Sequence, residues 1–229
     1  TISGTGAMAD YANSYQLPWY GYNYDVKTIV IESGVTSIGN SAFAKCRLLE
    51  SVSIPASVTS IGNYAFEDCG SNADAMTVSF AEGSTPLTIG EKAFNYANLK
   101  SIDIPNRVTS IGVGAFQYCS NLESVSIPAS VTSIGEEAFY YCGKLAKVYI
   151  FAPSLTTYGA DALEDNASGR KIYVLPEAVD TYKAGWSDYA ADIEAMTLYA
   201  VSVKDGVKDA DKWTISPNPA PEGSPVTIQ

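Results

Sequence analysis

Two residue types in this chain could do chemistry: four cysteines and an excess of carboxylates. The 229 residues include 25 Asp and Glu, 14 Lys and Arg and no histidine, which gives a net charge of −11. Histidine is the commonest general base and a common metal ligand, so catalysis would have to use carboxylates. An acidic chain without a basic run repels nucleic-acid phosphates, so we expect no nucleic-acid partner.

The cysteines fit a metal site, disulfides or buried thiols. They are Cys46, Cys69, Cys119 and Cys142, separated by 23, 50 and 23 residues. A metal site needs ligands that converge on one point, whereas this spacing places one cysteine in each of several similar segments. Disulfides within the pairs 46 and 69 or 119 and 142 are geometrically conceivable. A buried cysteine behaves as a small apolar side chain, so we predict four reduced, buried thiols.

Other patterns that could indicate an enzyme are weak. Gly112-Val113-Gly114 lacks the third glycine and the strand and helix context of a dinucleotide-binding loop. Glycoside hydrolysis needs two facing carboxylates about 5 to 10 Å apart, and adjacent acids such as Glu136 and Glu137 fall at variable, exposed positions. We therefore predict no catalytic residue, no metal and no cofactor.

A repeat of about 23 residues organises most of the chain. The string Val-Thr-Ser-Ile-Gly occurs at 35–39, 58–62, 108–112 and 131–135, with degenerate copies ending at Gly90 and Gly159. Each copy is followed by an Ala-Phe pair, or by Ala162 and Leu163 in the last. The four cysteines all lie three residues beyond the Phe, where the third copy has Ala97 and the sixth has Asn166. The cysteines are therefore repeat positions.

Each unit is expected to form a strand, a turn, a second short extended piece and one tight helical turn around Ala-Phe. The motif Leu-x-x-Val/Ile-x-Ile-Pro alternates like a strand, and its proline ends the pairing. A unit of this size cannot bury its apolar residues alone, so stacked units make a solenoid. We predict seven parallel strands in one continuous sheet, with central residues Ile29, Val52, Val78, Ile102, Val125, Val148 and Ile172.

The pattern I-G-x-x-A-F-x-x-C-x-x-L-x-x-I-x-I-P resembles the BspA-like leucine-rich repeat, also called the Treponema pallidum repeat. The resemblance implies a leucine-rich-repeat solenoid, capped at both ends, and the opening segment is similar to caps of gut bacterial proteins. We expect an N-terminal cap over 1–25, repeats over 26–176, a C-terminal cap over 177–197, and a linker with the start of a truncated domain over 198–229. An insertion around 69–86 and the sixth unit depart from the pattern.

Side chains on either side of each central strand residue are expected to face outward. These positions are mostly Ser and Thr in the middle units, and they change to Lys147, Tyr149, Lys171 and Tyr173 at the C-terminal end. Tyrosine and lysine together are typical of a partner-binding surface. Cross-strand stacking of the tyrosines for stability is the other interpretation.

We therefore expect a non-enzymatic binding module of a larger secreted or cell-surface protein, facing a protein or glycan partner. The resemblance implies adhesion, for instance to host matrix proteins such as fibronectin or fibrinogen. No apolar run reaches the roughly 18 residues of a membrane helix. The alternative is a structural spacer that displays a downstream domain, which the uniform Ser and Thr face favours.

Overall fold

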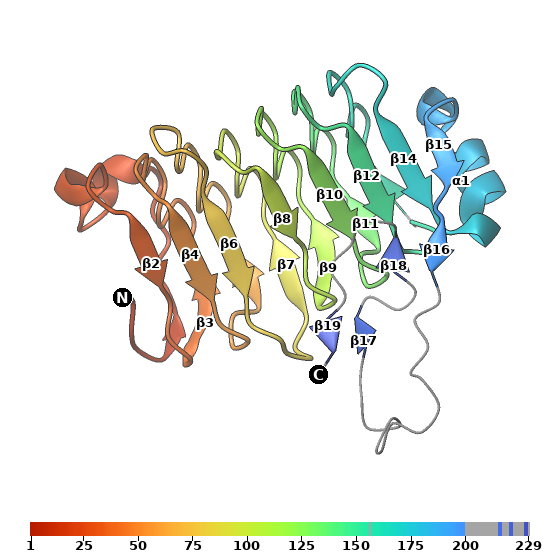
Figure 1. Ribbon diagram of the computed structural model, residues 1–229. Coiled ribbons are helices and arrows are strands. Elements are labelled where there is room, and N and C mark those ends of the chain that lie inside the picture. Colours follow the sequence, from red (N-terminus) through yellow and green to blue (C-terminus); the bar gives the residue numbers. More distant parts are fainter. Residues whose placement is uncertain (156, 200–214, 217–219, 222–226, 229) are drawn as a thin grey trace.

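The computed structural model describes residues 1–155 and 157–199, together with the short strands at 215–216, 220–221 and 227–228. Each repeat forms one coil of a solenoid, and each coil contributes one strand to a front row and one to a back row (Figure 1). Within these residues no helix is long and apolar enough to cross a membrane. The repeat architecture predicted from the sequence is confirmed.

The front row, which we call the strand face, contains all seven predicted strands and one more. Its members are β2 (Thr28–Val30), β4 (Ser51–Ile54), β6 (Thr77–Phe80), β8 (Ser101–Asp103), β10 (Ser124–Ile127), β12 (Lys147–Ile150), β14 (Lys171–Val174) and β15 (Ile193–Ala195). Paired neighbours are parallel, and the predicted central residues stand opposite one another. The additional strand β15 pairs with β14 and extends the row at its C-terminal end.

The prediction of one continuous sheet is wrong. The strand face consists of a three-stranded sheet, β2 to β6, and a five-stranded sheet, β8 to β15, so Val52 and Ile102 lie in different sheets. One bridge between Met76 and Leu99 joins the two. Two changes of length meet here: the insertion before β6, and a missing residue between Ala97 and Leu99, where other units have three steps from Cys to Leu. The insertion leaves β6 in register with β4, so the missing residue before β8 is the change that shifts β8 out of register with β6.

The back row is an unbroken sheet of seven strands across the same junction. Its members are β1 (Gly6–Ala7), β3 (Val35–Ile38), β5 (Ser60–Ile61), β7 (Leu87–Ile89), β9 (Val108–Ile111), β11 (Ser133–Ile134) and β13 (Thr157–Tyr158). The Val-Thr-Ser-Ile segments thus form a second sheet rather than isolated extended pieces. The glycine that follows is needed because adjacent coils nearly touch: a Cβ on Gly112 would lie 2.6 Å from the carbonyl carbon of Gly90.

The turn around each Ala-Phe pair, which we call the turn edge, joins a back strand to the next front strand at the top of Figure 1. Alternate amides bond three residues back, as from Ala44 to Ser41, while those between bond to the next coil, as from Phe43 to Ala65. This alternation requires left-handed backbone at two positions per unit. The residues with positive φ other than glycine are Ser41, Lys45, Tyr64, Asp68, Lys92, Tyr96, Tyr118, Glu137, Tyr141, Asp161 and Asp165.

The interior holds a continuous stack of aromatic rings. The stack runs from Trp19 through the five phenylalanines of the repeats, with centroid separations between 5.1 and 5.9 Å. The cysteines lie beside it, fully buried and free, as predicted. The thiol of Cys119 donates to the carbonyl of Phe94, and Cys69 and Cys142 make the same contact one coil back from themselves. Three of the four thiols thus satisfy a buried carbonyl.

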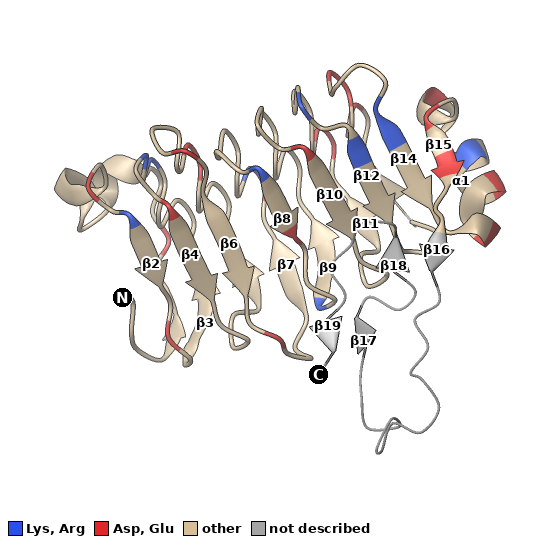
Figure 2. Ribbon diagram, viewed as in Figure 1, with Lys and Arg blue, Asp and Glu red and all other residues tan. Residues whose placement is uncertain are grey.

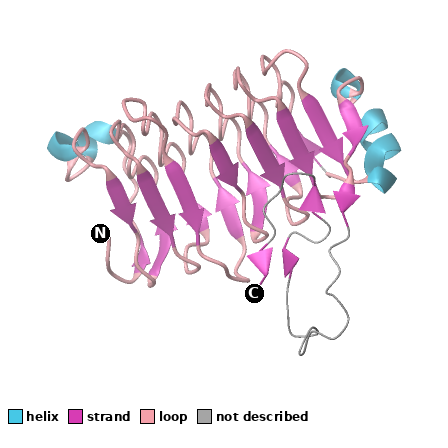
Figure 3. Ribbon diagram, in the orientation of Figure 1, coloured by secondary structure: helices cyan, strands magenta, loops and turns pink. Residues whose placement is uncertain are grey.

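The helical segments gather at the two ends of the array (Figure 3). They are η1 (Ser14–Gln16) and η2 (Tyr20–Tyr22) at the start, and η3 (Pro176–Ala178), α1 (Val179–Gly185) and η4 (Ser187–Tyr189) at the end. Beyond them, β16 (Leu198–Tyr199) pairs with β18 (Ala220–Pro221), and β17 (Ile215–Ser216) pairs with β19 (Thr227–Ile228). The expected linker and further domain at 198–229 fall largely outside the described residues. The proposed division into caps and repeats remains a prediction.

Candidate partner-binding surface

The middle of the strand face is a ladder of hydroxyl groups, as expected. Part of its hydrogen-bonding capacity is used between coils: the Ser51 hydroxyl lies 3.4 Å from that of Thr28, and Ser79 donates to the carbonyl of Val52. Hydroxyl groups that bond to the neighbouring coil stabilise the stacking of coils and are less available to a ligand. The hydroxyl ladder therefore contributes to the stacking of the coils.

The C-terminal end of the strand face differs, because the structure brings all four candidate residues together. Lys147 stands opposite Lys171, and Tyr149 stands opposite Tyr173, on the paired strands β12 and β14. The tyrosine rings stack with centroids 5.1 Å apart. Figure 2 shows the two lysines as the blue segments of these neighbouring strands. We call these four residues the strand-face cluster.

The two lysines of the cluster differ in their partners. Lys171 forms an ion pair with Glu194 of β15 at 2.6 Å, and this contact raises the pKa of Lys171. Adjacent like charges on paired strands repel, so Glu194 offsets part of the cost of placing Lys171 beside Lys147. Within the described residues, Lys147 has no ion pair. Glu194 was not predicted from the sequence, because β15 does not carry the repeat motif.

Neighbouring coils neutralise other charges of the strand face. Lys27 pairs with Glu50 at 2.9 Å, and Lys100 is 3.7 Å from Glu123. These ion pairs are exposed and contribute little to stability. They do cancel the local charge, so the positive charge of Lys147 stands out on this face.

A second group of tyrosines lies on the turn edge and was not identified from the sequence. Tyr96, Tyr118 and Tyr141 occupy the position before the cysteine column in successive units, and we call them the turn-edge tyrosine row. Their ring centroids are 4.5 Å and 5.3 Å apart. Tyr96 and Tyr141 are 51% and 47% exposed, whereas both rings of the strand-face cluster are half-buried. The signal was present: tyrosine recurs at one repeat position.

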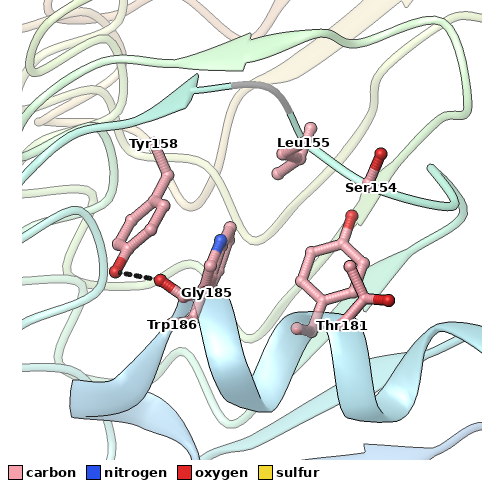
Figure 4. A pocket seen from close by; sticks show the side chains of 7 residues that line it. Ser154, Leu155, Tyr158, Thr181, Gly185 and Trp186 are labelled. Atoms are coloured by element: carbon pink, nitrogen blue, oxygen red, sulfur yellow. Dashed lines mark hydrogen bonds between the residues drawn. The ribbon is translucent and has the colours of Figure 1, made fainter.

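A cavity of about 230 Å3 lies between the last coil and α1 (Figure 4). Its lining residues are Ser154, Leu155, Tyr158, Thr181, Tyr182, Gly185 and Trp186. The Tyr158 hydroxyl donates to the carbonyl of Gly185, and the Tyr182 hydroxyl donates to that of Ala152. Burial raises the pKa of Tyr182. These polar groups hold α1 against the array, so the cavity is part of the C-terminal junction.

Side chains suited to metal binding do not gather anywhere in the part of the chain that the structure describes: no three of its Cys, Asp and Glu residues could share a metal ion. Burial also raises the pKa of three thiols, those of Cys69, Cys119 and Cys142, the last to about 12, so these thiols remain protonated and unreactive at neutral pH.

The repeat sequence and this geometry agree with a known family. The model of the BspA type leucine rich repeat region matches in six copies, over residues 20–81 and 87–199. The chain belongs to this family. The BspA-type repeat accounts for the columns of Ile, Ala-Phe and Cys described above. A comparison with curated proteins finds no match.

Several solved structures share the fold. The leucine-rich repeat protein TpLRR of T. pallidum aligns with a TM-score of 0.53 at 21% identity, covering 85% of this chain and 94% of that protein. The pneumococcal vaccine antigen PcpA gives 0.56 at 20% identity, with 78% and 47% covered. A leucine-rich cell surface protein of Faecalibacterium prausnitzii gives 0.55 at 27% identity, with 74% and 42% covered. The chain thus spans less than half of the latter two proteins.

Proposed function

We propose that this BspA-type array is a non-enzymatic binding module of a secreted or cell-surface protein, and that the strand-face cluster contacts its partner. The observation that carries the proposal is the stacked pair Tyr149 and Tyr173 beside the unneutralised Lys147. Elsewhere the strand face presents mainly hydroxyls and neutralised ion pairs, with the exposed carboxylate of Asp103 on β8 as an acidic exception. The F. prausnitzii protein described as a cell surface protein supports the proposed location.

The chemistry of the cluster favours a partner that is locally acidic. Tyrosine offers a large, rigid surface with a polar end, and it is enriched among residues that dominate binding energy. Lys147 adds attraction for carboxylate or sulfate groups, which added salt weakens. A host matrix protein or an acidic glycan would satisfy both requirements, and adhesion would be the result.

A structural spacer that displays a downstream domain is the second candidate. The observation that favours it is the hydroxyl ladder, in which Ser51 and Ser79 bond to the preceding coil. A spacer needs only coil stacking, and its surface residues are replaceable without loss of function.

Binding to immobilised fibronectin, fibrinogen and a panel of sulfated and neutral glycans separates the two. For a binding module we expect saturable binding that falls with salt. The Tyr149→Ala, Tyr173→Ala double variant should lose roughly 1 to 2 kcal/mol or more of binding free energy. Ser53→Ala, on the hydroxyl ladder, is the matched control and should bind like the unmodified protein.

Two results would contradict the proposal. Absence of binding across the whole panel would favour the spacer. Equal affinities of the double variant and the unmodified protein would move the contact to another surface. Thermal unfolding of each variant shows whether a loss of binding reflects a loss of folding.

A further inference from the structure

The turn-edge tyrosine row is a surface that the repeat fold does not require. Every unit has left-handed backbone at the position of the row, and the other units place Lys45, Asp68 and Asp165 there. A large aromatic residue is disfavoured at positive φ. The fold therefore tolerates small polar or charged residues at this position. Packing of the repeat does not require the three successive tyrosines.

The C-terminal end of the row is acidic. Asp165 occupies the next position after Tyr141, and exposed Glu164 and Asp161 lie on the same turn. The ring of Tyr140 packs edge-on against that of Tyr141, with centroids 4.8 Å apart. Burial, together with the charge of Asp165 and a hydrogen bond to it, raises the pKa of Tyr140. The nearest lysine along the chain, Lys144, donates to the side chain of Asn121. Among the described residues Asp165 has no ion pair.

At two other places in this protein, a tyrosine ring and a carboxylate together bind an arginine side chain. The guanidinium of Arg47 lies over the ring of Tyr24, 6.0 Å from its centroid, and pairs with Asp68 at 2.6 Å. Arg170 lies over Tyr189 at 5.0 Å and pairs with Asp192 at 2.6 Å. In both places one arginine uses a ring face and a carboxylate together. Asp68 lies at the same repeat position as the row, one unit before Tyr96, and its carboxylate is already paired with Arg47.

At the C-terminal end the ring and the carboxylate are present without the arginine. Tyr141 is 47% exposed, and its stacking partner Tyr118 covers one side of it. We propose that the turn-edge tyrosine row is a second docking surface, and that its occupant is a basic segment of a partner protein. An arginine of that segment stacks on Tyr141 and pairs with Asp165.

This surface is chemically opposite to the strand-face cluster. The strand-face cluster carries an unneutralised lysine and attracts acidic groups, whereas the turn edge combines tyrosine with carboxylates and attracts guanidinium groups. A planar guanidinium both stacks and forms two parallel hydrogen bonds, so arginine should bind better here than lysine. This preference separates the proposal from simple attraction between a cation and a protein of net charge −11.

The test uses a fluorescent Arg-Gly repeat peptide and its Lys-Gly counterpart as probes, at physiological salt. We expect the arginine peptide to bind more tightly. Tyr141→Asn and Asp165→Asn should each weaken its binding about two- to fivefold, the range of an exposed cation–π contact. Tyr141→Phe, which keeps the ring, should bind like the unmodified protein. Asparagine tolerates left-handed backbone, so these variants should fold.

Two matched controls keep the test specific. Tyr22→Asn removes a tyrosine that is 71% exposed in the N-terminal segment, and Asp180→Asn removes an exposed carboxylate from α1. Both should bind the arginine peptide normally. Equal losses in the controls, or equal binding of the two peptides, would overturn the proposal. Binding of a neutral oligosaccharide that Tyr141→Asn abolishes would assign the row to a glycan and overturn it as well.

Discussion

The aromatic column in the interior and the strand face at the surface differ in continuity. The column runs without interruption from Trp19 to Phe139, with successive rings close to parallel through the middle units. The strand face breaks between β6 and β8, where one β-bridge of the described residues joins Met76 and Leu99. Cohesion of the array therefore depends on the column and the back sheet. The strand face contributes less to this cohesion, which is compatible with its proposed role in partner binding.

Removal of a ring from the column should have the largest effect. Phe116 is fully buried between two stacked neighbours, so Phe116→Ala should destabilise the fold by about 3 to 5 kcal/mol. Phe80, at the end of β6 beside the break, is only partly buried, and Phe80→Ala should cost less than half as much. Denaturant unfolding measures both. Equal costs would mean that the two regions contribute alike.

The stability of the fold around the break between β6 and β8 should depend on one buried arginine. Arg107 is 5% exposed and donates to the carbonyls of Val58 and Pro55, across the coil that contains the insertion. Arg107→Met leaves both carbonyls without this partner, so we expect a loss of about 1 to 3 kcal/mol in unfolding free energy. Lys100→Met, which removes an exposed cation near the same break, is the control. A melting curve unchanged by Arg107→Met would show that the break needs no support.

The four thiols next to the aromatic column should not react with thiol reagents in the folded protein. Thiol reagents at pH 8 should find no reactive cysteine in the folded protein and four after unfolding without reductant, because all four side chains are fully buried and free. Cys119→Ala should cost about 1 kcal/mol, since it removes a small buried group and one weak hydrogen bond. Ala97 already occupies this position in the third unit. Fast labelling of the folded protein would contradict the continuity of the column.

The smallest effect concerns Glu67, which lies on the turn edge directly after Phe66. Burial raises the pKa of its carboxyl group above the ordinary 4.5. The folded protein therefore holds this proton more tightly than the unfolded chain does. The resulting contribution of Glu67 to the free energy of unfolding is fully present below pH 4.5 and is lost as pH rises through the folded pKa. Glu67→Gln should thus be slightly more stable than the unmodified protein at pH 7 and lose that advantage at acidic pH. Thermal melts at the two pH values test it.

The sequence predicted what the repeat pattern encodes. Identical positions recur along the chain, so the central residues of seven strands, the Ala-Phe column and the buried thiols could be placed before any coordinates. The break between β6 and β8 could not, because it comes from a change in segment length whose effect on register depends on the three-dimensional path of the loop.

The candidate sites were predictable in part for the same reason. Strand alternation correctly brought Lys147, Tyr149, Lys171 and Tyr173 to one place. It could not show that Glu194 neutralises Lys171, since β15 carries no repeat signature. It also could not direct attention to Tyr141, because side chains on left-handed backbone do not follow strand alternation.

The hydrogen bonds between coils run along the axis of the array, and this has a mechanical consequence. A pull on the two ends of the array loads these bonds lengthwise, so they open one coil at a time rather than resisting together in shear. The junction between β6 and β8 holds one β-bridge, with hydrogen bonds from Asn98 to Cys69, Gly70 and Ala73 beside it, and should part before the fully paired front strands, while the unbroken back sheet acts as a hinge. Under flow, a tethered copy would bend open at this point before any coil unravels.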